Sequence, residues 1–125
     1  MTRWIVHSEA TFHAMHALTT YEGRPEEPHE HQWKVKIRVG TAELNEEGYA
    51  IDFHKVHRLL ADAAKPLDGS DLNHHEGIGQ PSPTAERVAQ VLAYQLAPGC
   101  AALGGRLLSV SVWEGPENRV DLVLE

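Results

Sequence analysis

Histidines are the residues of this chain whose types and spacing most suggest chemistry. There are nine in 125 residues, and His29 and His31 are separated by one residue where a strand is predicted to begin. Because alternate residues of a strand point to one face, both imidazoles should lie on the same side. His16 lies near the end of the preceding predicted strand, and antiparallel pairing would bring it alongside. Three histidines with one open position form a catalytic zinc site, although spacing alone fits solvated histidines at loop edges equally well.

The strands that must position these histidines follow from their apolar pattern. Residues 3–18 have the β-branched and aromatic content of a strand, with an expected bulge. Residues 31–40 alternate strictly between apolar and polar, which predicts a half-buried strand. Its apolar face consists of Trp33, Val35, Ile37 and Val39. Residues 106–114 and 119–125 predict a terminal β-hairpin.

Two helices are predicted between the second strand and this hairpin. The first begins at Asp52, has apolar residues at helical spacing, and ends at Pro66. The second begins with Ser82 as its N-cap and Pro83 at its first position. It closes near Pro98-Gly99. The segment between them, residues 68–81, is a long loop of a kind that is often functional.

This order of elements predicts an α+β fold. We expect a four-stranded antiparallel sheet with two helices on one face, in a single domain that spans residues 1–125. Such a sheet leaves two exposed edge strands, and proteins usually protect such edges by pairing them with another chain. The sequence therefore also predicts a homo-oligomer.

The composition limits the classes of partner and the compartment. A net charge of −7 argues against nucleic acid or an anionic membrane surface as the main partner. No apolar run approaches the roughly 18 residues of a membrane helix, and the N-terminus does not read as a signal peptide. The single cysteine, Cys100, permits no intramolecular disulfide and excludes thiolate-rich structural zinc. We expect a cytoplasmic protein.

Six segments of the chain resemble one known family, in order and at similar spacing. They are TFHAMHAL, HEHQW, IDFHKV, LDGSDLN, SPTAERVA and VSVWEG. They are similar to motifs of the 6-pyruvoyltetrahydropterin synthase and 6-carboxytetrahydropterin synthase family. The resemblance implies a tunnelling fold, in which subunits assemble through their sheets into a barrel, commonly as a dimer of trimers with active sites between subunits. It also implies a pterin substrate and a zinc ion (Zn2+) held by His16, His29 and His31.

The resemblance assigns roles to several further residues. Glu114 matches the acid that grips the pterin, and a carboxylate suits the adjacent N–H donors of an aminopyrimidinone. Thr84 and Glu86 match a segment beside the ring pocket, although capping of a helix would explain them equally. Asp52 and Phe53 match a motif that we interpret as structural, with Phe53 in the core.

The chain departs from the family where protons are transferred. The family's chemistry on 7,8-dihydroneopterin triphosphate uses a cysteine thiolate and an Asp–His pair. Here Pro25 stands at the cysteine position, and Asp68 is followed by Gly69 where the histidine should be. Glu30 replaces a glycine between the zinc histidines, and Cys100 lies far away in sequence. The ordinary synthase reaction is therefore not expected.

Two replacements are available in the sequence. Some family members use a glutamate three residues before the first zinc histidine and cleave the side chain to give 6-hydroxymethyl-dihydropterin. Glu26 has that position here, and a carboxylate near a metal can act as a general base, although Glu27 beside it shows that glutamates are common in this loop. His74 or His75 is the candidate to replace the lost histidine. The expected function is thus a zinc-dependent pterin lyase, with elimination or cleavage of the side chain; the alternative is a zinc- and pterin-binding (or purine-binding) protein without catalysis.

Overall fold

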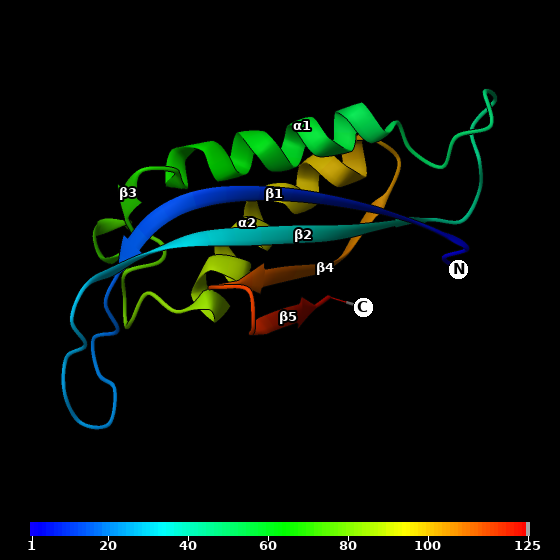
Figure 1. The fold of residues 1–125 in the computed structure, drawn as a ribbon. Coiled ribbons are helices and arrows are strands. Elements are labelled where there is room, and N and C mark those ends of the chain that lie inside the picture. The colour runs from blue at the N-terminus through cyan, green and yellow to red at the C-terminus, as the bar shows by residue number, and fades with distance from the viewer. Residues whose placement is uncertain (125) are drawn as a thin grey trace.

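In the computed structural model, which describes residues 1–124, two helices cover one face of a five-stranded sheet (Figure 1). The elements in chain order are β1 (Trp4–His16), β2 (His29–Thr41), α1 (Phe53–Ala64), β3 (Ser70–Asp71), α2 (Ala85–Ala102), β4 (Arg106–Trp113) and β5 (Arg119–Val123). Two short 3₁₀ helices flank β3, at Lys65–Leu67 and Leu72–His74. The strand order is β3-β1-β2-β4-β5. The α+β class and the two-helix layer are thus as predicted.

The sheet differs from the prediction by one strand. The four predicted strands are all present and antiparallel, but β3 adds a fifth that runs parallel to β1 at Ala14 and Met15. This strand lies inside the segment predicted to be a loop. It forms because the chain returns from α1 along the edge of β1, where the Gly69 N–H donates to the His13 carbonyl at 2.7 Å. The sheet is therefore mixed.

The pairing of β1 with β2 runs without a shift over the full length of both strands. It extends from Trp4 opposite Thr41 to His16 opposite His29. The bulge predicted within residues 3–18 is therefore wrong. The irregularity of this sheet lies instead between β2 and β4, at Arg38/Val39. An unbroken register keeps side-chain alternation in phase from one end of the pair to the other.

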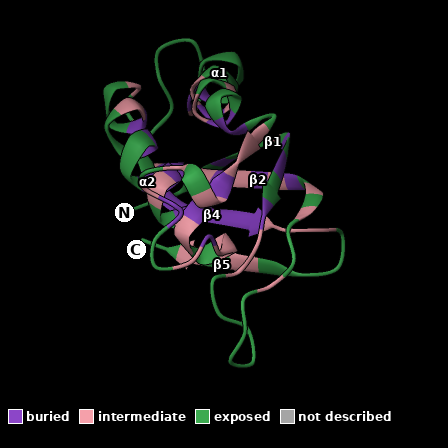
Figure 2. Ribbon diagram, turned by 90° about the vertical axis from the view of Figure 1, so that its left-hand side faces the viewer, coloured by how far each residue is buried: buried purple, intermediate pink, exposed green. Residues whose placement is uncertain are grey.

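The core lies between the sheet and the two helices. The four apolar residues of the alternating stretch, Trp33, Val35, Ile37 and Val39, are fully buried as predicted. Strand β4 is buried over almost its whole length because β2 and β5 flank it and α2 packs on it (Figure 2). The helices contribute stripes at helical spacing. These are Val56, Leu60 and Ala64 from α1, and Val88, Ala89, Leu92, Ala93, Leu96 and Cys100 from α2.

The boundaries of α2 differ from the prediction at both ends. Its N-cap is Thr84, whose hydroxyl accepts from the Arg87 N–H at 3.1 Å, and not Ser82. The helix also continues through Pro98 to Ala102. Pro98 lies on the exposed side of α2, where water can bond the carbonyl that loses its N–H partner. The α1 boundaries agree with the sequence: Asp52 caps the start by accepting from the His54 N–H at 2.8 Å, and α1 ends before Pro66.

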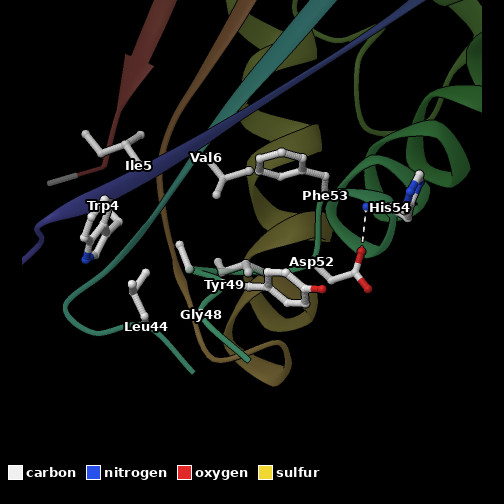
Figure 3. Close-up of a pocket in the computed structure, with 11 residues that line it drawn as sticks. Trp4, Ile5, Val6, Leu44, Gly48, Tyr49, Asp52, Phe53 and His54 are labelled. Atoms are coloured by element: carbon white, nitrogen blue, oxygen red, sulfur yellow. Dashed lines mark hydrogen bonds between the residues drawn. The ribbon is translucent and has the colours of Figure 1, made fainter. Parts of the chain in front are cut away.

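Phe53 is not in the core as predicted. Its side chain is 73% exposed, and in Figure 3 the ring points toward Val6 across an open groove. This groove has a volume of about 600 Å³ and lies where the apolar stripe of α1 begins. The loop after β2 does not fill the space beside the first turn, so the ring stays accessible. No helix in residues 1–124 is long and apolar enough to cross a membrane.

The packing of α2 on the sheet makes a direct prediction about stability. Leu92 is fully buried, whereas Tyr94 on the same helix is 86% exposed. Leu92→Ala should lower the free energy of unfolding by about 2–5 kcal/mol, because it removes buried carbons and leaves a cavity. Tyr94→Ala should change it by less than about 0.5 kcal/mol. Urea denaturation followed by circular dichroism measures both, and equal losses would contradict this account of the core.

Candidate metal centre

Three histidines meet where β1 ends and β2 begins. The strand register places His16 directly opposite His29, and strand alternation places His31 on the same face. The ring centroids of His16 lie 4.6 Å from His29 and 5.5 Å from His31, and those of His29 and His31 are 4.4 Å apart. Trp33 is the next residue in this row, and its ring lies edge-on to His16 at 4.9 Å. The indole therefore forms the inner wall of the cluster.

Glu114, the first residue after β4, completes the group. Its Oε1 lies 2.5 Å from His16 Nε2, 3.5 Å from His29 Nε2 and 3.4 Å from His31 Nε2. One ligand atom from each of the four residues lies within 4.8 Å of the others. The family resemblance predicted that Glu114 binds the pterin and did not place it beside the metal-binding histidines. Its proximity to the histidines depends on β4 lying beside β2, which the sequence pattern does not specify.

Main-chain carbonyls orient two of these rings. His16 Nδ1 is 2.8 Å from the Pro83 carbonyl oxygen, and His29 Nδ1 is 3.0 Å from that of Glu27. A carbonyl only accepts hydrogen bonds, so each Nδ1 carries the proton, and in the neutral ring the lone pair is on Nε2. Hydrogen bonds of this kind fix the tautomer and the direction of metal-binding histidines. Both Nε2 atoms face the centre of the cluster.

The donor set fits a divalent metal ion. His31 Nε2 is buried and has no hydrogen-bond partner in the described part of the chain. Burial lowers the pKa of His31, and the neighbouring His29 lowers it further, which favours the neutral ring that binds metals. Three imidazole nitrogens and a carboxylate oxygen are the ligand types that zinc prefers. A cation placed among these atoms would have all four as ligands.

A second layer of hydrogen bonds holds the end of β1 in place. The Asn73 amide accepts from the Ala17 N–H and donates to the Ala17 carbonyl, both at 2.8 Å. The Thr19 N–H donates to the Ser82 hydroxyl at 3.0 Å. These contacts anchor the residues after His16 to the segment before α2. Sequence reasoning gave Asn73 no role, although it belongs to the LDGSDLN segment that carried the family resemblance.

Glu26 lies at the rim of the cluster. Its Oε1 accepts from the Leu18 N–H at 3.0 Å and lies 3.7 Å from His29 Nδ1. Its own N–H donates to the Leu18 carbonyl at 2.9 Å. This reciprocal pair of bonds fixes the backbone and the carboxylate together. The side chain is 28% exposed, so the carboxylate is sheltered but reachable.

Two residues expected to transfer protons lie outside the cluster of this chain. Asp68 accepts from the His13 N–H at 2.9 Å, and it lines a separate cavity of about 560 Å³ with His57 and Lys65. His74 is 85% exposed, and its Nδ1 lies 3.2 Å from an Asp71 carboxylate oxygen. Neither is among the groups that surround Glu114.

The remaining expected residues have structural contacts. Thr84 caps α2 and Glu86 lies in the first turn of that helix. The Pro83 carbonyl between Ser82 and Thr84 holds His16, so this segment does border the cluster. Cys100 is buried within α2, and burial raises the pKa of its thiol. A buried neutral thiol is unsuited to replace the missing cysteine.

The fold and the histidine cluster together define an α+β protein with a group of side chains at one end of its sheet that could hold a metal ion. A family model described as 6-pyruvoyl tetrahydropterin synthase matches residues 5–124. The chain belongs to this family, as its motifs suggested.

Two relatives of known function cover most of the chain. A 6-carboxy-5,6,7,8-tetrahydropterin synthase of Synechocystis sp. is 30% identical over 93 residues, 69% of each chain. A dihydroneopterin monophosphate aldolase of Pyrococcus furiosus is 31% identical over 116 residues, 90% of this chain and 91% of the relative.

Solved structures share the fold at lower identity. The 6-pyruvoyl tetrahydropterin synthase of Caenorhabditis elegans superposes with a TM-score of 0.77 at 20% identity, over 100% of this chain and 99% of the other. A catalytic-residue mutant of the Plasmodium vivax 6-pyruvoyltetrahydropterin synthase, in which a glutamate is replaced by alanine, gives a TM-score of 0.75 at 15% identity, over 96% and 98% of the chains. At these identities the likeness concerns the fold.

The cluster predicts the metal affinity of single variants. The protein purified without a His tag should bind about one zinc ion per chain, as a single three-histidine site requires. His29→Ala should weaken zinc binding by about 100-fold or more, since it removes a ligand and not merely an outer hydrogen bond. His54→Ala, an exposed histidine on α1, should leave the affinity unchanged. Competition with a chromophoric chelator measures both, and equal affinities would contradict the assignment.

Proposed function

We propose that this protein is a metal-dependent carbon–carbon lyase that shortens the side chain of a phosphorylated 7,8-dihydroneopterin to give 6-hydroxymethyl-dihydropterin. The observation that carries the proposal is the carboxylate of Glu26, which is fixed by Leu18 at the rim of the histidine cluster. Pro25 stands where the synthases have their cysteine, and Glu26 next to it in the chain offers a carboxylate that can act as a general base. The ion at His16, His29 and His31 would be zinc.

The reaction can be written with the groups of this chain. His16, His29 and His31 would hold a zinc ion, which would supply polarisation of the hydroxyl oxygens of the substrate side chain. Glu26 removes the proton from the hydroxyl on carbon 2′, and the bond between carbons 1′ and 2′ breaks. Its electron pair moves into the C6=N5 imine of the ring, while carbon 2′ becomes an aldehyde. Glu26 then returns a proton to carbon 1′. The products are 6-hydroxymethyl-dihydropterin and a two-carbon hydroxyaldehyde that carries the phosphate.

One relative supports this choice of reaction. The Pyrococcus furiosus protein is named as an aldolase of dihydroneopterin monophosphate, and it matches nine-tenths of this chain. Within this chain, Glu114, Thr84 and Glu86 lie on the segments that would border the pterin ring.

We also propose that the enzyme works as a cytoplasmic homo-oligomer, a dimer of trimers, in which neighbouring subunits complete the site. The observations in favour concern residues that one chain leaves unused. Asp68 and His74 do not reach the cluster of their own chain, so they would act on that of a neighbour. Five large apolar side chains around the groove of Figure 3 are also 40–73% exposed. They are Trp4, Ile5, Leu44, Tyr49 and Phe53.

The same placement of Asp68 and His74 favours a second candidate function. A protein that binds a pterin or a purine-like ring at the metal without reacting would need neither of them. Both functions require the metal ion and binding of the pterin or purine-like ring. Only a measurement of product formation therefore distinguishes them.

Glu26 gives the sharpest test of the proposed reaction. Glu26→Gln should lower kcat by about 100-fold to 10,000-fold, the usual contribution of a positioned general base, while zinc content stays unchanged. Glu27→Gln, the neighbouring glutamate, should keep the full rate. Product formation from dihydroneopterin monophosphate, followed by mass spectrometry, measures both variants. An unaffected rate in Glu26→Gln would remove Glu26 from the reaction, and no turnover by the zinc-loaded wild type would favour the binding protein.

The oligomer can be tested at the groove. Ile5→Lys places a charge on the exposed edge of β1, where natural proteins use lysine to prevent strand pairing. Light scattering should show an assembly for the wild type and the 13.9 kDa monomer for this variant. Tyr94→Lys puts the same charge on the solvent side of α2 and should leave the assembly intact. A wild type that is monomeric at micromolar concentration would contradict the proposal.

A further inference from the structure

Glu114 has two potential partners that it cannot bind fully at once. The family resemblance gives its carboxylate to the pterin ring, whereas in the structure Oε1 lies among the three histidine nitrogens. The Glu114 side chain is 41% exposed, and His16 opposite it is completely buried. His29 and His31 are each 32% exposed, so the Glu114 carboxylate is the most exposed member of the group and can move outward to meet a ligand from solvent.

Two of the three distances from Glu114 Oε1 to the histidine nitrogens match the edges of a tetrahedral coordination shell. Zinc binds nitrogen and oxygen ligands at about 2.0–2.1 Å in a tetrahedron, so neighbouring ligand atoms should lie about 3.3–3.4 Å apart. The separations from His29 Nε2 and His31 Nε2 are 3.5 Å and 3.4 Å. The contact with His16 is shorter, at 2.5 Å, as for a hydrogen bond. Two of the three edges thus have the length that a shared cation would impose.

The tautomer of His16 strengthens this argument. Its Nδ1 proton is committed to the Pro83 carbonyl, so in the neutral ring Nε2 presents a lone pair to the Glu114 carboxylate. Two acceptors do not attract each other at hydrogen-bond distance. Either a proton or a metal ion must lie between them, and His29 and His31 offer two further nitrogens to the same point. A metal ion satisfies all four atoms together.

We infer that Glu114 is the fourth metal ligand of the ligand-free protein and closes the position that a catalytic metal must keep open. This role of Glu114 rests on the proposed function, because binding of the pterin ring would free the fourth coordination position of the metal. The adjacent N–H donors of the ring pair with the Glu114 carboxylate and withdraw it from the histidines. The side-chain oxygens of the substrate then find the open position. Substrate recognition and access to the metal are coupled through a single carboxylate.

The first half of this inference is tested without any substrate. Glu114→Ala should weaken zinc binding by about 10-fold or more, because it removes a direct ligand. Glu117→Ala removes an exposed carboxylate from the same loop and serves as the control for charge. Glu114→Gln keeps the shape of the side chain and should show a smaller loss. Zinc affinity that is equal in wild type and Glu114→Ala, or lowered equally in Glu117→Ala, would overturn the inference.

The second half is tested with cobalt in place of zinc. The visible spectrum of Co2+ reports the ligands around the ion, and adding 6-hydroxymethyl-dihydropterin should change it in the wild type but not in Glu114→Ala. Thiocyanate is a small anion that binds open coordination positions of metal ions. It should bind the cobalt ion of Glu114→Ala but not that of the ligand-free wild type. A wild type that binds thiocyanate freely would overturn the closed state. These readouts involve no turnover, so an inactive protein with the expected spectra would refute the proposed reaction and leave Glu114 as a ligand.

Discussion

The register between β1 and β2 is the constraint on which the site depends. Unbroken antiparallel pairing over both strands places His16 opposite His29 at the far end. A shift by one residue would turn the side chain of His16 to the other face of the sheet. The same register places Phe12 opposite Trp33, and these rings stack at 5.8 Å beside the cluster. The same strand pairing therefore determines both the packing of the core and the alignment of the histidines that could hold a metal ion.

Hydrogen bonds to loop residues orient two of the histidine rings, whose positions are set by the strands. The carbonyls of Pro83 and Glu27 set the tautomers of His16 and His29, and the Asn73 amide ties the chain after His16 to the segment beyond β3. These contacts explain why a segment of Gly, Asn and Asp is ordered next to the site. The rigid sheet sets the positions of the ligands, while the loops set the directions of their lone pairs.

Much of this arrangement could be predicted from sequence because it follows from periodicity. Alternation predicted β2 and its buried face, and the spacing of His29 and His31 predicted their common direction. Antiparallel pairing of the two strands predicted that His16 lies beside them, and the family motifs agreed. What periodicity does not contain is which strands become neighbours at a distance in sequence, so the contact of Glu114 with the histidines and the two-residue strand β3 were missed.

The errors at Phe53 and α2 have local physical reasons. Phe53 continues the apolar stripe of α1, but it lines an open groove at that end of the helix and its side chain stays 73% exposed. Pro98 would end a buried helix, yet on the exposed side of α2 its missing hydrogen bond costs little. Sequence patterns state the preference of a residue, and the surrounding structure decides whether the preference is met.

The central claim is that the side chain of a dihydropterin is cut between its first and second carbons at this site. The most direct measurement is the mass of the pterin product formed by zinc-loaded protein from dihydroneopterin monophosphate in D2O. The account predicts 6-hydroxymethyl-dihydropterin with one deuteron on the hydroxymethyl carbon, since Glu26 returns a solvent-exchanged proton there. A pterin product that retains all three side-chain carbons would contradict it.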